Sequence, residues 1–509
     1  MATLPKRALV PLQTLGQPSL SPSSIQLGAP AQRALQYYRV NTAKQLSGYF
    51  DDDFWTTSVL QVGDRDQCVS YALVALASLH EHFNAEAIGA AHLMAKDPEA
   101  ACRLAGPDMC SVPMRHALSY YTEAVRRLHT QISTCAGGQI ETTLLCCLLL
   151  AAFELLRGYH KESQVHLHGS AGLLQAWQDQ NAGRGGSIWS PRGYFIREKL
   201  GPLFCRMALQ ASLFGHAQPA PSSSNHGDDG AALAGFISDT HDSKKRTTYD
   251  DAGVRIASSA EARDTLYQLI WHMHLLPEGQ HHLKGTRTKR ARAKGQDNFI
   301  RGLHQWQDTL FKYLERQQSS SSVSSTMLKL LYTAARVIIP TFTLYDQMVF
   351  DSFATQFREM TDLAEALLFP SSPEPPPPAG HEVSCFFSLD MGVLHLLYHV
   401  VIRCRVWSTR HRALALLRRA QARREGVWDG AATALVAGRV VALEEQAARR
   451  HSAQIAADGD GDGGGGSSCI PASARVCSVR TDVDLENRTV VLRCGWQRDT
   501  WCSEELLTW

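Results

Sequence analysis

The stretch Glu141-Thr-Thr-Leu-Leu-Cys-Cys-Leu-Leu-Leu-Ala-Ala-Phe-Glu-Leu-Leu-Arg-Gly158 decides the fold class of this chain. Every residue from Leu144 to Phe153 is apolar, so a helix here has no face that is suited to water. A membrane span needs about 17–25 apolar residues, and Glu141, Glu154 and Arg157 confine this run to fewer. The stretch therefore predicts the buried central helix of a large helical domain.

The two ends of this helix are also encoded locally. Glu141 lies in the first turn, where a carboxylate interacts favourably with the helix dipole, and Arg157 lies in the last turn, where a cation does. Gly158 can adopt the left-handed backbone conformation that commonly ends a helix. We therefore expect the helix to cover residues 141–157.

Amphipathic helices are predicted on both sides of this stretch, because apolar residues recur at helical spacing. The predicted ranges are 31–48, 66–83, 113–132, 162–177, 259–276 and 297–316, two helices over 325–369 that separate near Pro340, and a second long helical section over 386–450. Near the C-terminus, residues 474–494 alternate like a β-hairpin around Asp484–Asn487. The predicted fold class is all-α: a large helical array with disordered inserts and a short C-terminal β-hairpin.

Composition divides the chain into one short tail and one long domain. Residues 1–30 are rich in Pro, Ser, Leu and Gln without periodicity, which is typical of a disordered linker or tail. Residues 31–509 are predicted to form one helical domain. Flexible inserts are expected within it at about 216–258, 371–381 and 458–468, where Gly, Ser, Asp or Pro dominate.

Overall composition excludes several classes of protein. With 509 residues and 44% hydrophobic residues, the chain can bury a sizeable core. Its net charge of +2 does not provide the strongly basic face of a DNA-binding domain. The N-terminus has no apolar run of signal-peptide length, and the thirteen cysteines are scattered, so we expect reduced thiols in an intracellular compartment.

Two motifs resemble metal sites, but each lacks an essential residue. His395-Leu-Leu-Tyr-His399 has the histidine spacing of zinc peptidases, yet Leu396 stands where their catalytic Glu would be. Asp458-Gly-Asp-Gly-Asp-Gly463 copies the start of a calcium loop, but its twelfth position is Cys469. There is no Cys-x-x-Cys pair, so structural zinc is not expected. We predict interior or rim histidines, a low-complexity linker and no metal ligands.

No motif of covalent or phosphoryl-transfer chemistry occurs in the chain. Gly-x-Ser-x-Gly and a phosphate-cradling Gly-rich loop with Lys are both absent from the sequence. Asp51-Asp52-Asp53 invites comparison with the magnesium motif of helical terpene cyclases, but the required acid one turn later is missing. We therefore predict no catalytic residues, no cofactor and no enzymatic activity.

One basic run stands out between residues 284 and 294. It holds six cations and no acid: Lys284, Arg287, Lys289, Arg290, Arg292 and Lys294. The functional interpretation is a nuclear-import signal or a phosphate-contacting patch, and the alternative is a solvated loop. Lys244-Lys245-Arg246 is a weaker second candidate.

The order of segments along the chain resembles one known family. The segments in question are Ala34–Arg39, Gln67–His80, Ala117–Leu128, Phe153–Gly158 and His166–Leu174, and downstream Cys404–Arg405, Arg410–Leu417, Arg424–Trp428, Glu444–Glu445 and Ile470–Val476. In this order and spacing they resemble the regulatory domain of fungal-specific zinc-cluster transcription factors. The resemblance covers roughly residues 31–178 and 385–509.

The chain departs from that family at its N-terminus. Such factors normally carry a six-cysteine cluster that holds two zinc ions and reads DNA, whereas the first cysteine here is Cys68. We expect either that the gene product lacks this module or that the sequence is truncated. Residues 11–24 resemble what would remain of the following linker. The chain alone is therefore not expected to bind DNA sequence-specifically.

The resemblance implies regulation of transcription in a fungal nucleus, specific to one pathway or gene cluster. The implied mechanism is contact with the transcription machinery or other regulators, or sensing of an unknown small molecule, by the helical domain. A homodimer or a heterodimer would fit, and no membrane association is expected. Two alternatives remain: a stand-alone partner or co-repressor of a full-length factor, and an all-α enzyme that reuses the scaffold.

Overall fold

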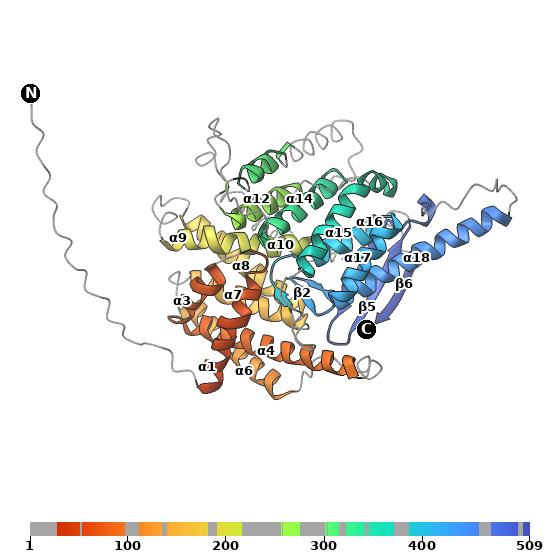
Figure 1. The fold of residues 1–509 in the computed structure, drawn as a ribbon. Coiled ribbons are helices and arrows are strands. Elements are labelled where there is room, and N and C mark those ends of the chain that lie inside the picture. The colour runs from red at the N-terminus through yellow and green to blue at the C-terminus, as the bar shows by residue number, and fades with distance from the viewer. Residues whose placement is uncertain are drawn as a thin grey trace, which may run out of the picture.

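The computed structural model describes residues 28–50, 53–96, 111–134, 140–181, 191–215, 256, 258–274, 301–302, 304–313, 315, 322–341, 346–370, 386–457, 470–496 and 502–509. Helices dominate these residues, and two small three-stranded sheets join them in the C-terminal part (Figure 1). The all-α prediction is confirmed. The predicted inserts at 371–381 and 458–468, and most of the tail at 1–30 and of the insert at 216–258, lie outside the described residues.

The central helix is α7 (Ile140–Arg157), and it is buried as predicted. Every residue from Thr143 to Leu156 is buried, and Glu154 is ion-paired with Arg157 at 3.1 Å. Three long helices pack around it or around its neighbours: α4 (Gln67–Lys96), α6 (Val112–Thr134) and α8 (His160–Asn181). These four helices form the N-terminal half of the core.

The chain reaches this bundle through short helical segments. They are α1 (Ala29–Tyr37), η1 (Tyr38–Thr42), α2 (Ala43–Leu46), η2 (Phe54–Ser58) and α3 (Val59–Gly63). Gly48 follows α2 with a φ of 62°, so the predicted stop at this glycine is confirmed. Tyr38, Phe54 and Trp55 are fully buried, and they anchor these short segments on the core.

The middle of the chain adds a second helical layer. Its elements are α9 (Pro191–Phe195), η3 (Ile196–Leu200), α10 (Gly201–Gly215), α12 (Ser259–His274), a helical segment at 304–313, α14 (Val323–Thr341), η6 (Gln347–Phe353) and α15 (Ala354–Leu368). Pro340 stands one residue before the end of α14. The predicted separation of two helices near Pro340 is therefore confirmed.

The section from 386 to 450 is less uniformly helical than predicted. Its helices are α16 (Leu394–Arg403), α17 (Trp407–Arg419) and α18 (Gly430–Ala457), and its strands are β1 (Phe386–Ser388), β2 (Arg423–Glu425) and β3 (Trp428–Asp429). Strand β1 pairs in parallel with β2, and β2 pairs antiparallel with β3. Strands of two or three residues are too short to show the alternation that identifies a strand in a sequence.

The predicted C-terminal hairpin is present and has a third strand. Strands β4 (Ser478–Asp484) and β5 (Thr489–Gly495) pair antiparallel, and β6 (Ser503–Thr508), which was not predicted, pairs with β5. Val490, Leu492 and Cys494 on β5 are buried in a cluster with apolar residues of α18. One face of the sheet therefore covers α18.

Contacts between distant segments join the two halves of the chain. Tyr159 donates a hydrogen bond to Glu486 at 2.6 Å, and Arg424 donates one to the Leu156 carbonyl. Gly158 has a φ of 89°, and a Cβ atom there would lie 2.5 Å from Leu485, so the hairpin turn approaches the end of α7 closely. One continuous apolar core extends from α1 to α18. These contacts join the described parts of the two halves, and the single domain over residues 31–509 stays a prediction.

Candidate functional site

The residues singled out in the sequence do not gather into a reactive centre among the described parts of the chain. The basic run, from Lys284 to Lys294, lies outside the described residues, so its role stays a prediction. The described residues contain no group of three or more His, Cys, Asp or Glu side chains that could hold a metal ion. Within the same described residues, no helix is long and apolar enough to cross a membrane.

His395 and His399 are half-buried, on one side of α16. The ring of His395 packs near Trp428, and that of His399 packs near Phe350 and Phe357. Burial lowers the pKa of each imidazole to about 3, so both are neutral near pH 7. Their surroundings are aromatic, in agreement with the interpretation as interior or rim histidines.

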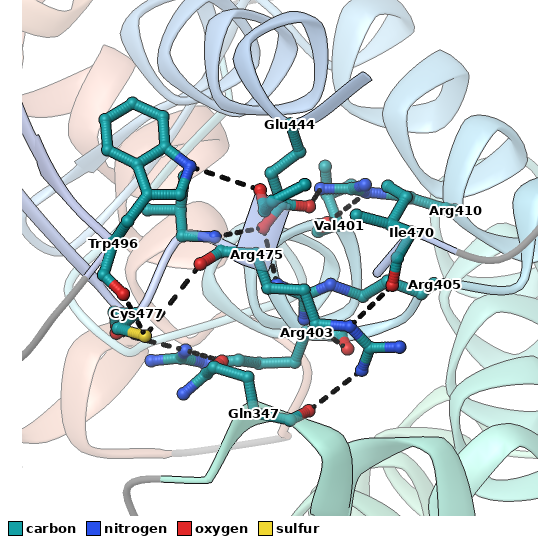
Figure 2. Close-up of polar contacts among 12 residues, drawn as sticks. Gln347, Val401, Arg403, Arg405, Arg410, Glu444, Ile470, Arg475, Cys477 and Trp496 are labelled. Atoms are coloured by element: carbon teal, nitrogen blue, oxygen red, sulfur yellow. Dashed lines mark hydrogen bonds and ion pairs between the residues drawn. The ribbon is translucent and has the colours of Figure 1, made fainter. Parts of the chain in front are cut away.

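The most highly organised polar site lies where α16, α17 and α18 meet (Figure 2). We call it the Glu444 cluster, and it comprises Arg403, Arg405, Arg410, Glu444 and Arg475. Glu444 is fully buried on α18. Its Oε1 accepts hydrogen bonds from Arg405 Nη2 and from the backbone N–H of Val476, each at 2.6 Å. Its Oε2 lies 2.7 Å from Arg410 Nη2.

Two arginines of the Glu444 cluster also complete the end of α16. The last carbonyls of a helix have no partner within it. Arg410 Nε donates to the Val401 carbonyl at 2.8 Å, and Arg405 Nη1 donates to the Arg403 carbonyl at 2.6 Å. Positive charge at this end also interacts favourably with the helix dipole. The two side chains therefore fix the turn from α16 to α17.

Arg475 connects the segment before β4 to η6. Its guanidinium is fully buried and donates to both carboxylate oxygens of Asp351 at 2.8 Å. It also donates to the backbone carbonyls of Ile470 at 2.9 Å and Gln347 at 3.1 Å. Arg403 donates to the Gln347 side chain at 2.5 Å, so the two arginines converge on one residue of η6.

The electrostatics of the Glu444 cluster suit positioning better than catalysis. Burial lowers the pKa of Arg405 to about 10, although attraction by Glu444 opposes this, so the guanidinium stays charged near pH 7. Burial raises the pKa of the neighbouring Cys477, whose thiol donates to the Trp496 carbonyl at 3.2 Å. That sulfur is therefore a protonated donor and not an activated nucleophile.

A second buried charged group links the middle layer to the loop after β1. Asp390 accepts hydrogen bonds from Arg206 at 2.6 Å and from Arg263 at 2.8 Å, and Arg206 is also paired with Asp264. Burial alone would raise the pKa of Asp390, but attraction by the two arginines and their hydrogen bonds lowers it below its ordinary value of 3.8. The carboxylate therefore stays ionised and holds α10 and α12 together.

The sequence identified some of the residues in these two charged groups, but not which side chains pair with each other. The segments containing Arg405, Arg410, Glu444 and Arg475 carried the family resemblance, but nothing predicted which side chains meet. A usable signal existed, because Glu444 lies on the apolar face of α18 with Ala437, Val440 and Val441. A charged residue on an apolar helix face indicates a buried partner.

Comparison with known proteins gives one match. Residues 33–206 match the fungal specific transcription factor domain. The resemblance recognised over residues 31–178 is thereby confirmed, and this match supports a fungal transcriptional regulator, whereas the part over residues 385–509 lies outside it. No curated protein sequence and no solved structure matches the chain.

The fungal specific transcription factor domain covers the core bundle and reaches into α10. The family is a transcription factor domain and not an enzyme family, and it implies a nuclear regulator of zinc-cluster type. The Glu444 cluster lies outside the matched residues, whereas Arg206, which pairs with Asp390, is the last matched residue.

Proposed function

We propose that this chain regulates transcription in a fungal nucleus through protein contacts made by a helical domain at residues 31–509. The observation that carries the proposal is the match of residues 33–206 to the fungal specific transcription factor domain. The contacts between α7 and the C-terminal hairpin support including the rest of the chain in the same functional unit. Its targets would be the genes of one pathway or gene cluster.

The proposed partners are the transcription machinery or other regulators, and not DNA itself. The net charge of +2 offers little of the phosphate attraction that supplies non-specific DNA affinity. The purified chain should therefore show no sequence-preferring mobility shift at physiological salt.

A reporter experiment tests this function directly. The chain is fused to a foreign DNA-binding domain, and the output of a reporter with the matching operator is measured in a fungal host. We expect a change in output relative to the DNA-binding domain alone, because regulation lies in the helical surface. Leu148→Asp in the fusion is a matched control that should abolish the change through unfolding.

An inert fusion would contradict regulation by the chain alone and favour the second candidate, a stand-alone partner or co-repressor of a full-length zinc-cluster factor. That candidate rests on the same family match. Co-purification of such a factor with the tagged chain from the native host would distinguish the two.

Nuclear import is proposed to depend on the basic run between Lys284 and Lys294. Replacing Lys289, Arg290 and Arg292 with Ala should lower the nuclear fraction of a fluorescent fusion, because import signals are read through clustered cations. Replacing the exposed cations Arg39, Arg115 and Lys161, which stand outside both basic runs, with Ala provides the matched control. Unchanged nuclear fluorescence in the first variant would leave the run as a solvated loop.

A further inference from the structure

An exposed tryptophan stands at the first position of α17. Trp407 is 62% exposed, and the preceding Val406 is 38% exposed. The indole is held in place by the ring of His411 one turn later, with ring centroids 4.6 Å apart. A large aromatic side chain that is exposed but conformationally restrained loses little entropy when a partner covers it.

The register of α17 and α18 brings one basic side chain of α18 to the level of this tryptophan. His411 on α17 is paired with Glu445 on α18 at 2.9 Å, and Gly438 of α18 faces Leu414 and Arg418 of α17, so the helices run antiparallel. One turn beyond the His411–Glu445 pair, Trp407 on α17 and Arg449 on α18 therefore stand at the same level. Arg449 and Arg450 are exposed, and α18 continues past the neighbouring helices there (Figure 1).

The Glu444 cluster holds α17 and α18 in place beneath this surface. Glu444, Arg405 and Arg410 are buried directly beneath the surface that carries Glu445, Val406 and His411, their sequence neighbours. Because the buried ion pairs hold the two helices in one register, Trp407 and Arg449 keep a constant spacing. Val406, Trp407, His411 and Arg449 form what we call the Trp407 surface.

The chemistry of the Trp407 surface determines the kind of partner that fits it. Glu445 is already paired with His411, and among the described residues no acidic side chain forms an ion pair with Arg449 or Arg450. A cation beside an exposed indole complements a ligand with a carboxylate next to an apolar side chain. Trp and Arg are also the residues most enriched among those that dominate binding energy at protein interfaces.

We propose that the Trp407 surface binds an acidic peptide segment of another protein through an aromatic or aliphatic anchor residue. This inference rests on the proposed function, because it names the partner chemistry of a regulator that acts by protein contact. A single-stranded nucleic acid would also offer negative charge and stacking, but it usually needs a basic groove that follows several phosphates. An exposed indole with one arginine at its level fits a short acidic segment better.

The experiment measures binding of a fluorescein-labelled peptide, in which glutamates alternate with phenylalanines, to the full-length chain by fluorescence anisotropy. Trp407→Ala should weaken binding by at least about tenfold, as expected for an anchor residue. Arg449→Glu should weaken it by a similar factor, and binding to the wild type should weaken as salt rises, because exposed charges are screened. Matched controls are Tyr194→Ala on α9 and Arg115→Glu on α6, which replace exposed residues elsewhere and should leave affinity unchanged.

A second readout reports on Trp407 directly. The chain contains ten tryptophans, which can be labelled with fluorotryptophan and observed by fluorine NMR. The resonance that is absent from the spectrum of Trp407→Phe belongs to Trp407. That resonance should shift when the peptide is added. Circular dichroism of each variant checks that lost binding does not reflect lost folding.

Several results would overturn the proposal. The first is that Trp407→Ala and the wild type bind the peptide with equal affinity, and the second is that a peptide with serines in place of the glutamates binds equally well. The third is that a single-stranded oligonucleotide binds more tightly than the peptide. The fourth is that the peptide does not bind at all. An active reporter fusion combined with absent peptide binding would reject the Trp407 surface and leave the proposed function standing. Trp407-dependent peptide binding combined with an inert fusion would support the Trp407 surface and reject the proposed function.

Discussion

Helix α7 and the junction of α17 with α18 are both buried, but they bury opposite chemistry. Helix α7 presents apolar side chains on every face from Leu144 to Phe153. The junction buries Glu444 together with Arg405 and Arg410. The first is stabilised by the removal of apolar surface from water, and the second by charged hydrogen bonds that must offset the loss of hydration.

This difference predicts two kinds of sensitivity to mutation. Apolar burial has no direction, so α7 should tolerate changes that preserve volume and apolar character. A buried ion pair depends on geometry and on the presence of both partners. Removing one partner leaves the other charge buried and unpaired, which costs more than the pair itself contributes. Substitutions at the two sites test this contrast.

The largest effect is expected at the centre of α7. Leu148→Asp places a carboxylate among apolar side chains, at a cost of several kcal/mol, comparable to a total stability of about 5–15 kcal/mol. The variant should unfold or aggregate, as seen by circular dichroism and size-exclusion chromatography. Val165→Asp on α8, where the wild-type side chain is 69% exposed, is the control that should melt normally. A soluble Leu148→Asp variant that melts like the wild type would show that α7 is not part of the core.

The next largest effect is expected at the Glu444 cluster. Glu444→Gln keeps the shape of the side chain but leaves Arg405 and Arg410 without their carboxylate, and should lower the free energy of unfolding by about 3–5 kcal/mol. Urea denaturation measures the change. Glu445→Gln is the matched control at the next position, where the partly exposed pair with His411 should contribute about 1 kcal/mol or less. Equal effects of the two variants would contradict the contrast between buried and surface pairs.

A smaller effect that depends on pH is expected at Asp390. Asp390→Asn should lower the free energy of unfolding by about 2 kcal/mol at pH 7, less than at Glu444 because Arg206 keeps Asp264 as a partner. The pKa of Asp390 is lowered in the folded protein, so the unfolded chain binds the proton more readily. The contribution of the carboxylate is complete above its unfolded pKa of 3.8 and is lost as pH falls through the lower folded value.

Urea midpoints measured from pH 7 downward check this sign. The difference between the wild type and Asp390→Asn should be constant near neutral pH and should shrink below about pH 4. Asp482→Asn on β4, an exposed position, is the control and should show no such convergence. A difference that grew as the pH fell would mean that the pKa of Asp390 is raised and not lowered.

The local parts of the fold could be predicted from the sequence because each is encoded within one segment. The all-apolar run predicted α7, and Gly48 and Gly158 marked the ends of helices through their positive φ angles. The alternation around Asp484–Asn487 predicted the pairing of β4 with β5. In each case, periodicity or backbone freedom acts over a few neighbouring residues.

The candidate site was predictable only in part. The sequence marked the segments around Arg405, Arg410 and Glu444 through their family resemblance, and the position of Glu444 on an apolar face indicated that it has a buried partner. It did not indicate that Val476 or Asp351 would complete the group. The exposure of Trp407 was not apparent either, because a tryptophan at the start of a helix is equally compatible with burial.

The sequence by itself determined the helical class, the buried centre and the turn at residues 484–487, since those depend on short-range periodicity and turn chemistry. The tertiary structure alone decided that β1 pairs with β2, that β6 completes the second sheet, and that Arg475 reaches Asp351 across 124 residues of chain. Such contacts are selected by the packing of the whole core. Many guanidiniums and carboxylates in the chain could pair, and only the folded backbone brings particular ones within hydrogen-bonding distance.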